Sequence, residues 1–335
     1  MTHKYALIDL ANTFFRARHV ASRNSTAEEK VGMSLHLTLA SINQVVKRFG
    51  IGHVVVCTEG RSWRRDFYKL YKANRVVDTM SQTEAEAEEN KLFWSTYANF
   101  TTYLKDRTNV SVLRDPKAEA DDLIARFIHL HPENDEHFIV SSDTDFLQLI
   151  THNVKQYNGI TNELITLEGY FDDKGRPVKD KKTKEPKLLE DPQYILFRKI
   201  MRGDTTDNVF SAWPGVREKG SKKKAGLIEA YADRTKQGYA WNNMQLQRWT
   251  DHEGNEVRVR DAYERNRVLI DLTAQPDEVK LSVDTNIREG VRRTTIPQVG
   301  IHLMKFCGKY ELNKIADNAE TYAKWLNSPY VGVLK

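Results

Sequence analysis

Residues 5–10 of the chain read YALIDL, a short apolar run that ends in Asp9 and Leu10. A run of this length and composition is typical of a strand that is buried on both faces of a parallel sheet. Residues 53–57 (HVVVC) repeat the pattern and are followed by Glu59. Each of these predicted strands therefore carries an acidic residue at or just beyond its carboxyl end.

A third apolar run, residues 137–140 (HFIV), is followed by Asp143 and Asp145. Between the runs lie segments with helical patterns, and residues 110–113 form a further short strand. The helical segments are residues 30–49, 62–75, 91–104 and 118–130. Strands that alternate with helices predict an α/β fold with a largely parallel central sheet and helices on both faces. In such sheets the functional site lies beyond the carboxyl ends of the strands, where the acids fall.

The remaining segments show less periodicity. Residues 174–187 are polar and predict an exposed hairpin or loop, and the acid-rich residues 84–89 predict a solvated, mobile segment. From about residue 193 the pattern is helical, without convincing strand alternation. We therefore expect an α/β core followed by a helical C-terminal region.

The composition fits a folded protein with a polyanionic partner. The chain has 335 residues, 40% of them hydrophobic and 29% charged, and a formal net charge of +5. Cys57 and Cys307 stand far apart, so neither a disulfide framework nor a cysteine-based zinc site is expected. The sequence has no apolar run of the length that a signal peptide or a membrane span requires, and we expect a cytoplasmic protein without a membrane partner.

Five segments place carboxylates after predicted strands or at the starts of predicted helices. These acids are Asp9, Glu59, Glu119, Asp121, Asp122, Asp143, Asp145, Asp204 and Asp207. Phosphodiester hydrolysis benefits from two divalent cations about 3.5–4 Å apart, and hard cations such as Mg²⁺ prefer oxygen ligands. Without cations, converging carboxylates would repel one another. The set therefore predicts a metal-dependent phosphodiester hydrolase.

Spacing refines the prediction for individual acids. Within one continuous helix, Asp121 would lie about 200° around the axis from Glu119, so both face one site only if the helix begins between them. For Asp122, a helix cap or a supporting role behind the metal ligands is favoured over direct ligation. Asp204 and Asp207 would share a face if they lay on a helical turn.

Residues 62–75 combine apolar and basic side chains at helical spacing. One side carries Trp63, Phe67, Leu70, Tyr71 and Asn74, and another carries Arg64, Tyr68, Lys72 and Arg75. One interpretation is an amphipathic helix whose basic face is only solvated. The other is a basic helix beside the metals, whose charges attract the scissile phosphate and whose aromatic faces stack on an unpaired base.

A second basic cluster, residues 214–226, reads PGVREKGSKKKAG. It differs from a nucleotide-binding phosphate loop, because Ser221 rather than Lys follows the second glycine and because no strand precedes it. Its charges are either solvated or form a turn between helices that contacts duplex phosphates. The candidates for this contact are Arg217, Lys219, Ser221, Lys222, Lys223 and Lys224.

Together these motifs resemble those of the 5′ nuclease (flap endonuclease) family. The matching stretches are residues 8–12 (IDLAN), 63–75 (WRRDFYKLYKANR), 119–124 (EADDLI), 141–149 (SSDTDFLQL) and 202–209 (RGDTTDNV). Weaker similarity continues through residues 263–271 to the C-terminal helices, so the resemblance covers nearly the whole chain. It implies a nuclease core of the 5′ nuclease/PIN-like type.

The resemblance also implies two neighbouring sites for Mg²⁺, for which Mn²⁺ would substitute. One site would draw on Asp9, Glu59, Asp121 and Asp143. The other would draw on Glu119, Asp145, Asp204 and Asp207, and Asp122 would support the set or add a ligand. The family usually has Asp where this chain has Glu59, which puts the geometry of that ligand in question.

In the same family, the segment at about residues 61–90 forms a helical arch over the active site. By resemblance, Lys72 and Arg75 would be catalytic and would stabilise charge on the phosphate. Arg64 and Asn74 would contact nucleic acid, and Tyr71 would either stack on a base or belong to the core. The second basic cluster would be a helix–turn–helix DNA-binding element, which in the family often holds K⁺; the sparser glycines here leave that ion open.

The expected domains are residues 1–205, a nuclease core with the arch, and residues 206–335, a helical duplex-binding region. The expected function is a structure-selective 5′ nuclease, both 5′→3′ exonuclease and flap endonuclease, acting on DNA and RNA–DNA hybrids by a two-metal mechanism. The resemblance implies removal of RNA primers from lagging-strand fragments in phage replication, within the cytoplasm of the host.

The expected partners are branched or nicked DNA and RNA–DNA duplexes with a 5′ end or flap. A single-strand-binding protein or a sliding clamp is a further expected partner, and the chain is expected to be a monomer. The alternative function is a catalytically inactive protein that binds branched DNA, motivated by Glu59 and by the basic clusters.

Overall fold

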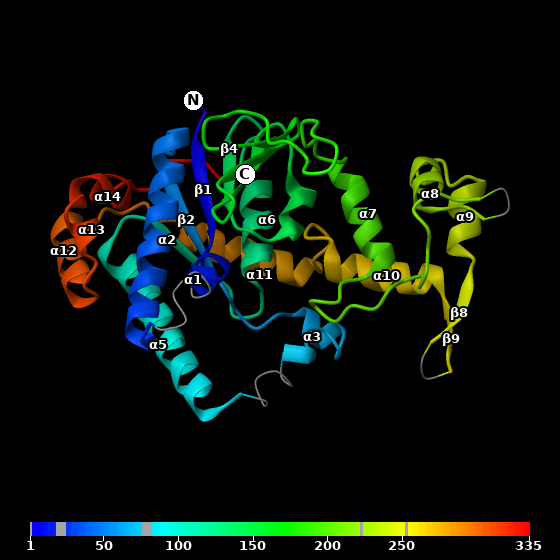
Figure 1. Cartoon of the computed structure of the whole chain (residues 1–335), viewed down its shortest axis with the longest axis horizontal. Coiled ribbons are helices and arrows are strands. Elements are labelled where there is room, and N and C mark those ends of the chain that lie inside the picture. The colour runs from blue at the N-terminus through cyan, green and yellow to red at the C-terminus, as the bar shows by residue number, and fades with distance from the viewer. Residues whose placement is uncertain (1, 18–24, 76–81, 222–223, 252–253) are drawn as a thin grey trace. The chain divides into compact units, whose positions relative to one another are not determined.

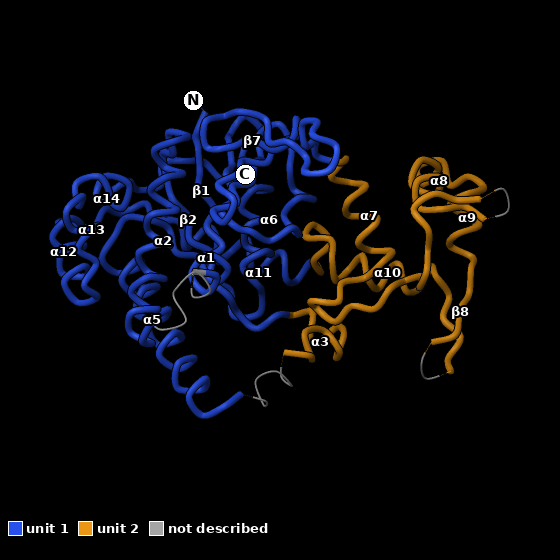
Figure 2. Tube along the Cα trace, in the orientation of Figure 1, with its two compact units in different colours: residues 1–62, 82–189, 277–335 blue, residues 63–81, 190–276 orange. Residues whose placement is uncertain are grey.

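A computed structural model describes residues 2–17, 25–75, 82–221, 224–251 and 254–335 (Figure 1). The chain divides into two compact units, which are described separately. Unit 1 comprises residues 1–62, 82–189 and 277–335, and unit 2 comprises residues 63–81 and 190–276 (Figure 2). These units differ from the expected single boundary at residue 205, because the last segment of the chain packs within unit 1. The expected arch falls partly in each unit and partly outside the described residues.

Unit 1 contains a seven-stranded sheet in the order β3-β2-β1-β4-β5-β6-β7. The strands are β1 (Lys4–Asp9), β2 (His53–Thr58), β3 (Ser111–Arg114), β4 (Glu136–Val140), β5 (Val154–Asn158), β6 (Glu163–Thr166) and β7 (Gly169–Phe171). The first five strands pair in parallel, whereas β6 and β7 are antiparallel additions. The predicted α/β class with a largely parallel sheet is confirmed.

Helices cover both faces of this sheet. Ala6 and Ile8 of β1 belong to the same core as residues of α2 (Ala27–Phe49) and α5 (Glu84–Arg107). Tyr5 points to the opposite face, where its ring contacts Phe127 of α6 (Ala120–Leu130). The alternation follows from the two-residue period of a strand and from side chains that are apolar on both faces.

Further helices complete the two layers. Helix α1 (Leu10–Ala17) follows β1 directly, and α11 (Asp277–Gly290) packs on α6 through the Arg126–Asp284 ion pair, with 2.6 Å between Nη2 and Oδ2. The C-terminal helices join the core of α2 and α5. They are α12 (Val299–Lys309), α13 (Asn313–Ala316) and α14 (Ala319–Leu326). Among the described helices, none combines the length and the apolar character that crossing a membrane requires.

Unit 2 is built around α7 (Pro192–Arg202) and α10 (Val259–Ile270). Helices α8 (Leu227–Asp233) and α9 (Tyr239–Gln245) and the strands β8 (Arg248–Thr250) and β9 (Glu256–Arg258) complete it. Its core includes Phe197, Met201, Leu227 and Ala262. The predicted helical C-terminal region is confirmed. The antiparallel β8–β9 ribbon within it was not predicted, because strands of three residues leave almost no alternation to read.

The predicted helix at residues 62–75 is wrong over most of its length. Helix α3 (Arg64–Phe67) is followed by turns over residues 69–73, in which Lys72 adopts φ 54°, and the chain is helical again at residues 74–75. Within unit 2, Asp207 O accepts the backbone N–H of Lys72 (2.9 Å), and Leu70 O accepts Asn208 Nδ2 (2.7 Å). These bonds to a distant segment replace the hydrogen bonds that a continuous helix would make.

The acid-rich residues 84–89 are the start of α5 and not a separate mobile segment. A capping box fixes this start: the Thr83 hydroxyl accepts Glu86 N (3.3 Å), and the Glu86 carboxylate accepts Thr83 N (2.8 Å). The acids also interact favourably with the positive end of the helix dipole.

Candidate metal centre

The acids of unit 1 lie where the strand order of the sheet reverses. From β1 the chain continues to β2 and β3 on one side and returns to β4 and β5 on the other. Asp9 is the last residue of β1, Glu59 follows the end of β2, and Asp143 and Asp145 follow β4. A crevice beyond the strand ends at such a reversal is the usual binding site of an open α/β sheet.

Asp9 is held by the segment that follows β4. Its side chain is buried, with Oδ2 accepting the Ser141 hydroxyl (3.0 Å) and Oδ1 accepting Asn12 N (3.1 Å). The Ser141 oxygen also accepts Asp143 N (3.1 Å). Asn12 Oδ1 accepts Ser142 N and the Ser142 hydroxyl, both at 3.0 Å. The β1 and β4 strand ends therefore form one hydrogen-bonded unit.

The segment after β4 is also fixed from the neighbouring strand. Gln156 of β5 is buried, and its Nε2 donates to Ser141 O (3.0 Å) and Asp143 O (2.6 Å). Asp143 Oδ1 accepts Asp145 N (2.9 Å), which starts a 3-10 helix at Thr144–Leu149. These bonds set the backbone that presents Asp143 and Asp145, and sequence reasoning did not identify Gln156.

The start of α6 contributes three further acids. Helix α6 begins at Ala120, between Glu119 and Asp121, which satisfies the condition for both to face one site. Asp122 is fully buried, and its Oδ2 accepts Glu119 N (3.1 Å), so the structure places Asp122 as a helix cap. Glu59 Oε2 accepts Ala120 N (3.2 Å). The longer side chain at position 59 thus reaches the first turn of α6, where negative charge is favoured.

The acids of unit 1 influence one another's charge. Burial and then the charges of Asp9, Glu59, Asp143 and Glu119 raise the pKa of Asp121 well above its ordinary value. Burial and then Asp9, Asp121 and Glu59 raise the pKa of the Cys57 thiol in the same way. Tyr97 of α5 was not predicted from the sequence, yet burial, Glu59 and Asp9 raise its pKa. Carboxylates gathered in this way disfavour one another's charge, and a bound cation would offset that cost.

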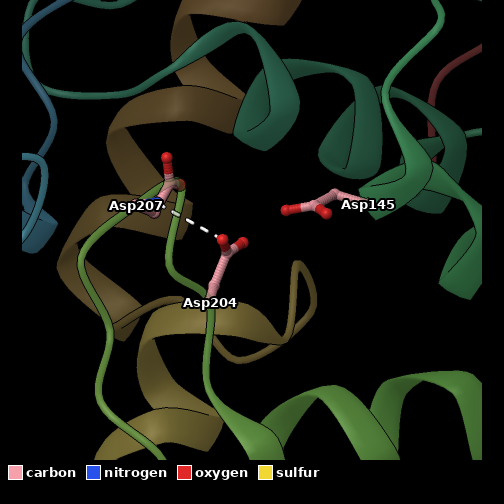
Figure 3. Close-up of side chains that lie close together, drawn as sticks. All are labelled: Asp145, Asp204 and Asp207. Carbon is pink, nitrogen blue, oxygen red and sulfur yellow. Dashed lines mark hydrogen bonds between the residues drawn. The ribbon is translucent and has the colours of Figure 1, made fainter.

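In unit 2, Asp204 and Asp207 lie on one tight turn rather than on a helical turn. A bridge pairs Asp204 with Val209, and Asp204 Oδ1 accepts the backbone N–H of Thr206 (2.8 Å) and Asp207 (3.3 Å; Figure 3). Burial would raise the pKa of Asp204, but Lys199 Nζ, 2.7 Å from Oδ2, and these backbone donors lower it overall. Asp204 therefore remains ionised.

Four predicted residues of the 62–75 segment, namely Tyr71, Lys72, Asn74 and Arg75, gather around the same turn within unit 2. Asp207 Oδ2 accepts the Tyr71 hydroxyl (2.9 Å) and lies 3.5 Å from Lys72 Nζ. Asp207 Oδ1 accepts Arg75 Nη2 (2.9 Å), and Asn74 Nδ2 donates to Thr206 O (3.3 Å). The ion pairs and the hydroxyl hold Lys72 and Arg75 next to an acid of the predicted metal set.

Two residues of this segment are more buried than side chains that contact nucleic acid would be. Tyr71 is only 4% exposed, which agrees with the core interpretation of its ring. Arg64 is 1% exposed, and its Nε donates to Leu269 O (2.8 Å) while its guanidinium lies over the Trp63 ring. The prediction that Arg64 contacts nucleic acid is at odds with this burial, because the side chain serves the core of unit 2.

The second basic cluster precedes α8. Arg217, Lys219, Ser221 and Lys224 are exposed, whereas Lys222 and Lys223 lie outside the described residues. Glu229 Oε2 accepts the backbone N–H of Gly220 and Gly226, both at 2.9 Å. A Cβ atom on Gly220 would lie 2.6 Å from Gly226 N, so the close approach of the two segments requires glycine.

Comparison with known proteins identifies the family. Residues 4–175 match the family described as 5'-3' exonuclease, N-terminal resolvase-like domain. This match covers more than half of the chain, and the chain belongs to that family. The resemblance of the motifs to 5′ nucleases is thereby confirmed.

The chain is similar to Ribonuclease H of Enterobacteria phage T4, with 28% identity over 283 residues, covering 78% of this chain and 79% of that protein. It is 25% identical over 224 residues to a 5'-3' exonuclease of Mycoplasmopsis pulmonis, covering 66% of this chain and 65%, just under two thirds, of the relative. A solved structure of T5 5'-exonuclease with bound zinc has a TM-score of 0.58 at 20% identity, covering 86% of this chain and 99% of that one. At this identity the structural match shows the shared fold.

Proposed function

We propose that the protein is a Mg²⁺-dependent 5′ nuclease that hydrolyses phosphodiester bonds at 5′ ends and 5′ flaps of branched DNA and RNA–DNA duplexes. The observation that carries this proposal is the convergence of Asp9, Glu59, Glu119, Asp121 and Asp143 at the carboxyl ends of the parallel strands. Their mutual repulsion, expressed in the raised pKa of Asp121, supports cation binding there. Oxygen ligands alone fit Mg²⁺, with Mn²⁺ as a substitute.

We assign Asp9, Glu59, Asp121 and Asp143 to one ion. The ligands of a second ion would come from Glu119, Asp145, Asp204 and Asp207. Asp122 would hold Glu119 in place by accepting a hydrogen bond from the backbone N–H of Glu119. Ions held by these residues would supply Lewis-acid chemistry for phosphodiester hydrolysis, whose expected products are a 5′ phosphate and a 3′ hydroxyl. Ser141 and Asn12 keep the carboxylate of Asp9 oriented.

Lys72 and Arg75 would stabilise negative charge on the scissile phosphate. Both are held at Asp207 by ion pairs, which fix the direction in which the two cations point. Asn74 would assist from the same turn. Arg217, Lys219, Ser221 and Lys224, with Lys222 and Lys223, would hold the duplex through its phosphates, so branch and end structure, not base sequence, would select the substrate. K⁺ at this turn stays a prediction.

The similarity to a ribonuclease H and to 5'-3' exonucleases supports a role in removing RNA primers from lagging-strand fragments. A single-strand-binding protein or a sliding clamp remains the expected protein partner. These finer assignments rest on resemblance, while the carboxylate site rests on the geometry of unit 1.

The test is cleavage of a 5′-flap duplex labelled on the flap strand, incubated with Mg²⁺ or with EDTA and resolved on a denaturing gel. The proposal expects products from the 5′ end or the junction in Mg²⁺ and none in EDTA. Binding without cleavage in both Mg²⁺ and Mn²⁺ would overturn it in favour of an inactive branched-DNA-binding protein.

A further inference from the structure

Residues 174–187 of unit 1, here called the basic arm, carry charge that the proposed site does not use. Seven of these fourteen residues are Lys or Arg and two are acidic, giving a net charge of +5, equal to that of the whole chain. Every basic residue of the arm except the partly buried Lys187 is exposed. The expected exposed hairpin is thus a concentrated positive surface.

Two turns give the basic arm a defined shape. Asp172 Oδ1 accepts Lys174 N and Arg176 N, both at 2.9 Å. Asp180 Oδ1 accepts Lys182 N (2.8 Å) and Thr183 N (2.9 Å). These bonds lower the pKa of both aspartates. The acids of the turns therefore order the backbone, and the basic side chains extend from it.

The arm is also attached to the last strand of the sheet. Val178 N donates to Tyr170 O (2.8 Å), Lys187 N donates to Val178 O (2.7 Å), and Tyr170 N donates to Lys187 O (3.1 Å). Gly169 makes this possible, because its φ is +131° and a Cβ there would lie 2.5 Å from Lys187 O. The basic arm is thus a fixed extension of β7.

The first turn of the arm lies toward the amino ends of the parallel strands. Gly175 lines a cavity together with Lys4 and Glu136, the first residues of β1 and β4. Arg48 Nη2 donates to Asp172 O (2.5 Å) beside it. A strand of six residues spans about 20 Å, so about 20 Å separates this turn from the acids at the carboxyl ends of the strands. Along a duplex, this distance corresponds to about six nucleotides of one strand, at about 3.4 Å per nucleotide.

Most of the charge on the arm has no partner among the residues that the structure describes. Arg176 pairs with Asp172, and Lys187 lies over the Tyr170 ring. Within the described parts of the chain, the other lysines of the arm form no ion pair; they are Lys174, Lys179, Lys181, Lys182 and Lys184. Their ammonium groups are available to an external polyanion.

We propose that the basic arm is a second contact surface for nucleic acid, which binds phosphates away from the cleavage site. The inference rests on the proposed nuclease function. Lysines on flexible stems suit phosphates, which carry charge but no sequence information. Protein interfaces, in contrast, are depleted in lysine. The arm therefore adds affinity and salt sensitivity, while the chemistry stays with the carboxylates.

A simpler role for these lysines is protection of the sheet edge. β7 is the last strand of the sheet, and lysines on an edge strand prevent pairing with other chains. That role predicts no effect on nucleic-acid binding, so a binding measurement separates the two.

The test compares two variants that lose the same charge. In the arm variant, Lys174, Lys179, Lys181 and Lys182 are changed to Ala. In the control, four exposed lysines of α12–α14 and their connections are changed to Ala: Lys305, Lys309, Lys314 and Lys324. Fluorescence anisotropy would measure binding of a 5′-flap duplex, a blunt duplex and a single strand over a series of KCl concentrations, with Ca²⁺ in place of Mg²⁺.

We expect the arm variant to bind at least about tenfold more weakly at low salt. The slope of log K against log salt should become shallower by about 0.9 for each lost duplex phosphate contact. The control should keep the wild-type slope, and kcat at saturating substrate should stay unchanged in both. Loss confined to the duplexes or to the single strand would identify which phosphates the arm contacts.

Equal affinity and slope in the arm variant and the control would overturn the inference, as would a loss of kcat without a change in affinity. A wild-type protein that binds the flap duplex without cleaving it would instead contradict the proposed nuclease function. The two failures are therefore distinguishable.

Discussion

The Glu59 side chain reaches from the end of β2 to the start of α6. Its Oε2 accepts the first backbone amide of α6, Ala120 N, at 3.2 Å. The helix start favours negative charge, which partly offsets the repulsion from Asp9 and Asp121. Glu59 therefore links the end of β2 to the helix that carries Glu119 and Asp121.

At the same scale, Asp145→Asn should abolish Mg²⁺-dependent cleavage while binding of the flap duplex survives. The substitution keeps the size of the side chain and removes the charge that a hard cation requires. Gel assays of cleavage and anisotropy measurements of binding check the two parts separately. Full retained activity would remove Asp145 from the metal set.

Gln156→Met should weaken metal binding by about 10- to 100-fold, the usual effect of losing a group that orients metal ligands. Methionine has a similar length but cannot donate to Ser141 O and Asp143 O. Calorimetric titration with Mn²⁺ measures the affinity without relying on activity.

The matched control is Asn109→Leu, which removes another buried amide of unit 1. Asn109 Nδ2 donates to Asn327 O (3.1 Å) and Ile296 O (3.3 Å). We expect this variant to lose about 1–3 kcal/mol of stability and to keep its Mn²⁺ affinity. Equal Mn²⁺ affinity in the wild type and Gln156→Met would exclude the positioning role.

Among single residues, the acids of the site were predictable from the sequence, whereas the residues that hydrogen-bond to the acidic segments or pack beside them were not. Asp9, Asp143 and Asp145 follow apolar runs, so the period of the strands places them. Gln156 and Tyr97 reach the site through the packing of β5 and α5, and no local pattern marks which polar residue of a strand or helix will do so.

At the scale of elements, a cluster of buried histidines joins β2, α6, β4 and the C-terminal residues. His53 Nδ1 contacts Ser328 O (2.8 Å), and His131 Nε2 contacts the Tyr330 hydroxyl (2.8 Å). For His137, no hydrogen-bond partner of either ring nitrogen is found among the described residues. Burial lowers the pKa to about 4 for His53 and His131 and to about 3 for His137.

The sign of the pH dependence follows from these shifts. The folded-state pKa values lie below the unfolded value of about 6.5, so the unfolded chain binds protons first as the pH falls. Each histidine then costs about 1.4 kcal/mol of stability per pH unit between pH 6.5 and its folded pKa. The substitution His137→Phe removes one such group. As the pH falls, the free energy of unfolding of this variant should therefore decrease less steeply than that of the wild type, by about 1.4 kcal/mol per pH unit.

Urea unfolding between pH 7 and pH 4.5 measures this difference. The charged groups elsewhere are the same in both proteins, so their contributions cancel in the comparison. Identical slopes for the wild type and His137→Phe would show that His137 does not remain neutral in the fold.

Elements with strong local signals were predictable, and those set by distant contacts were not. Apolar runs identified β1, β2 and β4. The Thr83–Glu86 capping box was a readable signal for the start of α5 that the acid-rich composition concealed. By contrast, residues 62–75 have helical spacing, yet Asp207 and Asn208 take their backbone groups, which local periodicity cannot reveal. The strands β5–β7 were not predicted either, because they are short and carry polar residues such as Lys155 and Gln156.

At the scale of the whole molecule, each compact unit combines acidic and basic groups that suit a polyanionic substrate. Unit 1 holds the converging carboxylates and, toward the amino ends of the strands, the basic arm. Unit 2 holds Asp204 and Asp207 with Lys72 and Arg75, and the basic turn before α8. The net charge of +5 is thus the sum of acidic and basic clusters in each unit, such as the carboxylates and the basic arm of unit 1.

The central claim is that the carboxylates of unit 1 repel one another and are stabilised by divalent cations. Because the pKa of Asp121 is raised in the fold, its ionised form destabilises the metal-free protein above that pKa. The most direct measurement is thermal unfolding of the wild type and Asp121→Asn in EDTA and in Mg²⁺ at pH 8.

We predict that Asp121→Asn melts at a higher temperature than the wild type in EDTA, and that Mg²⁺ raises the Tm of the wild type by the larger amount. A variant that is less stable than the wild type in EDTA, together with a wild-type Tm that is indifferent to Mg²⁺, would contradict the account.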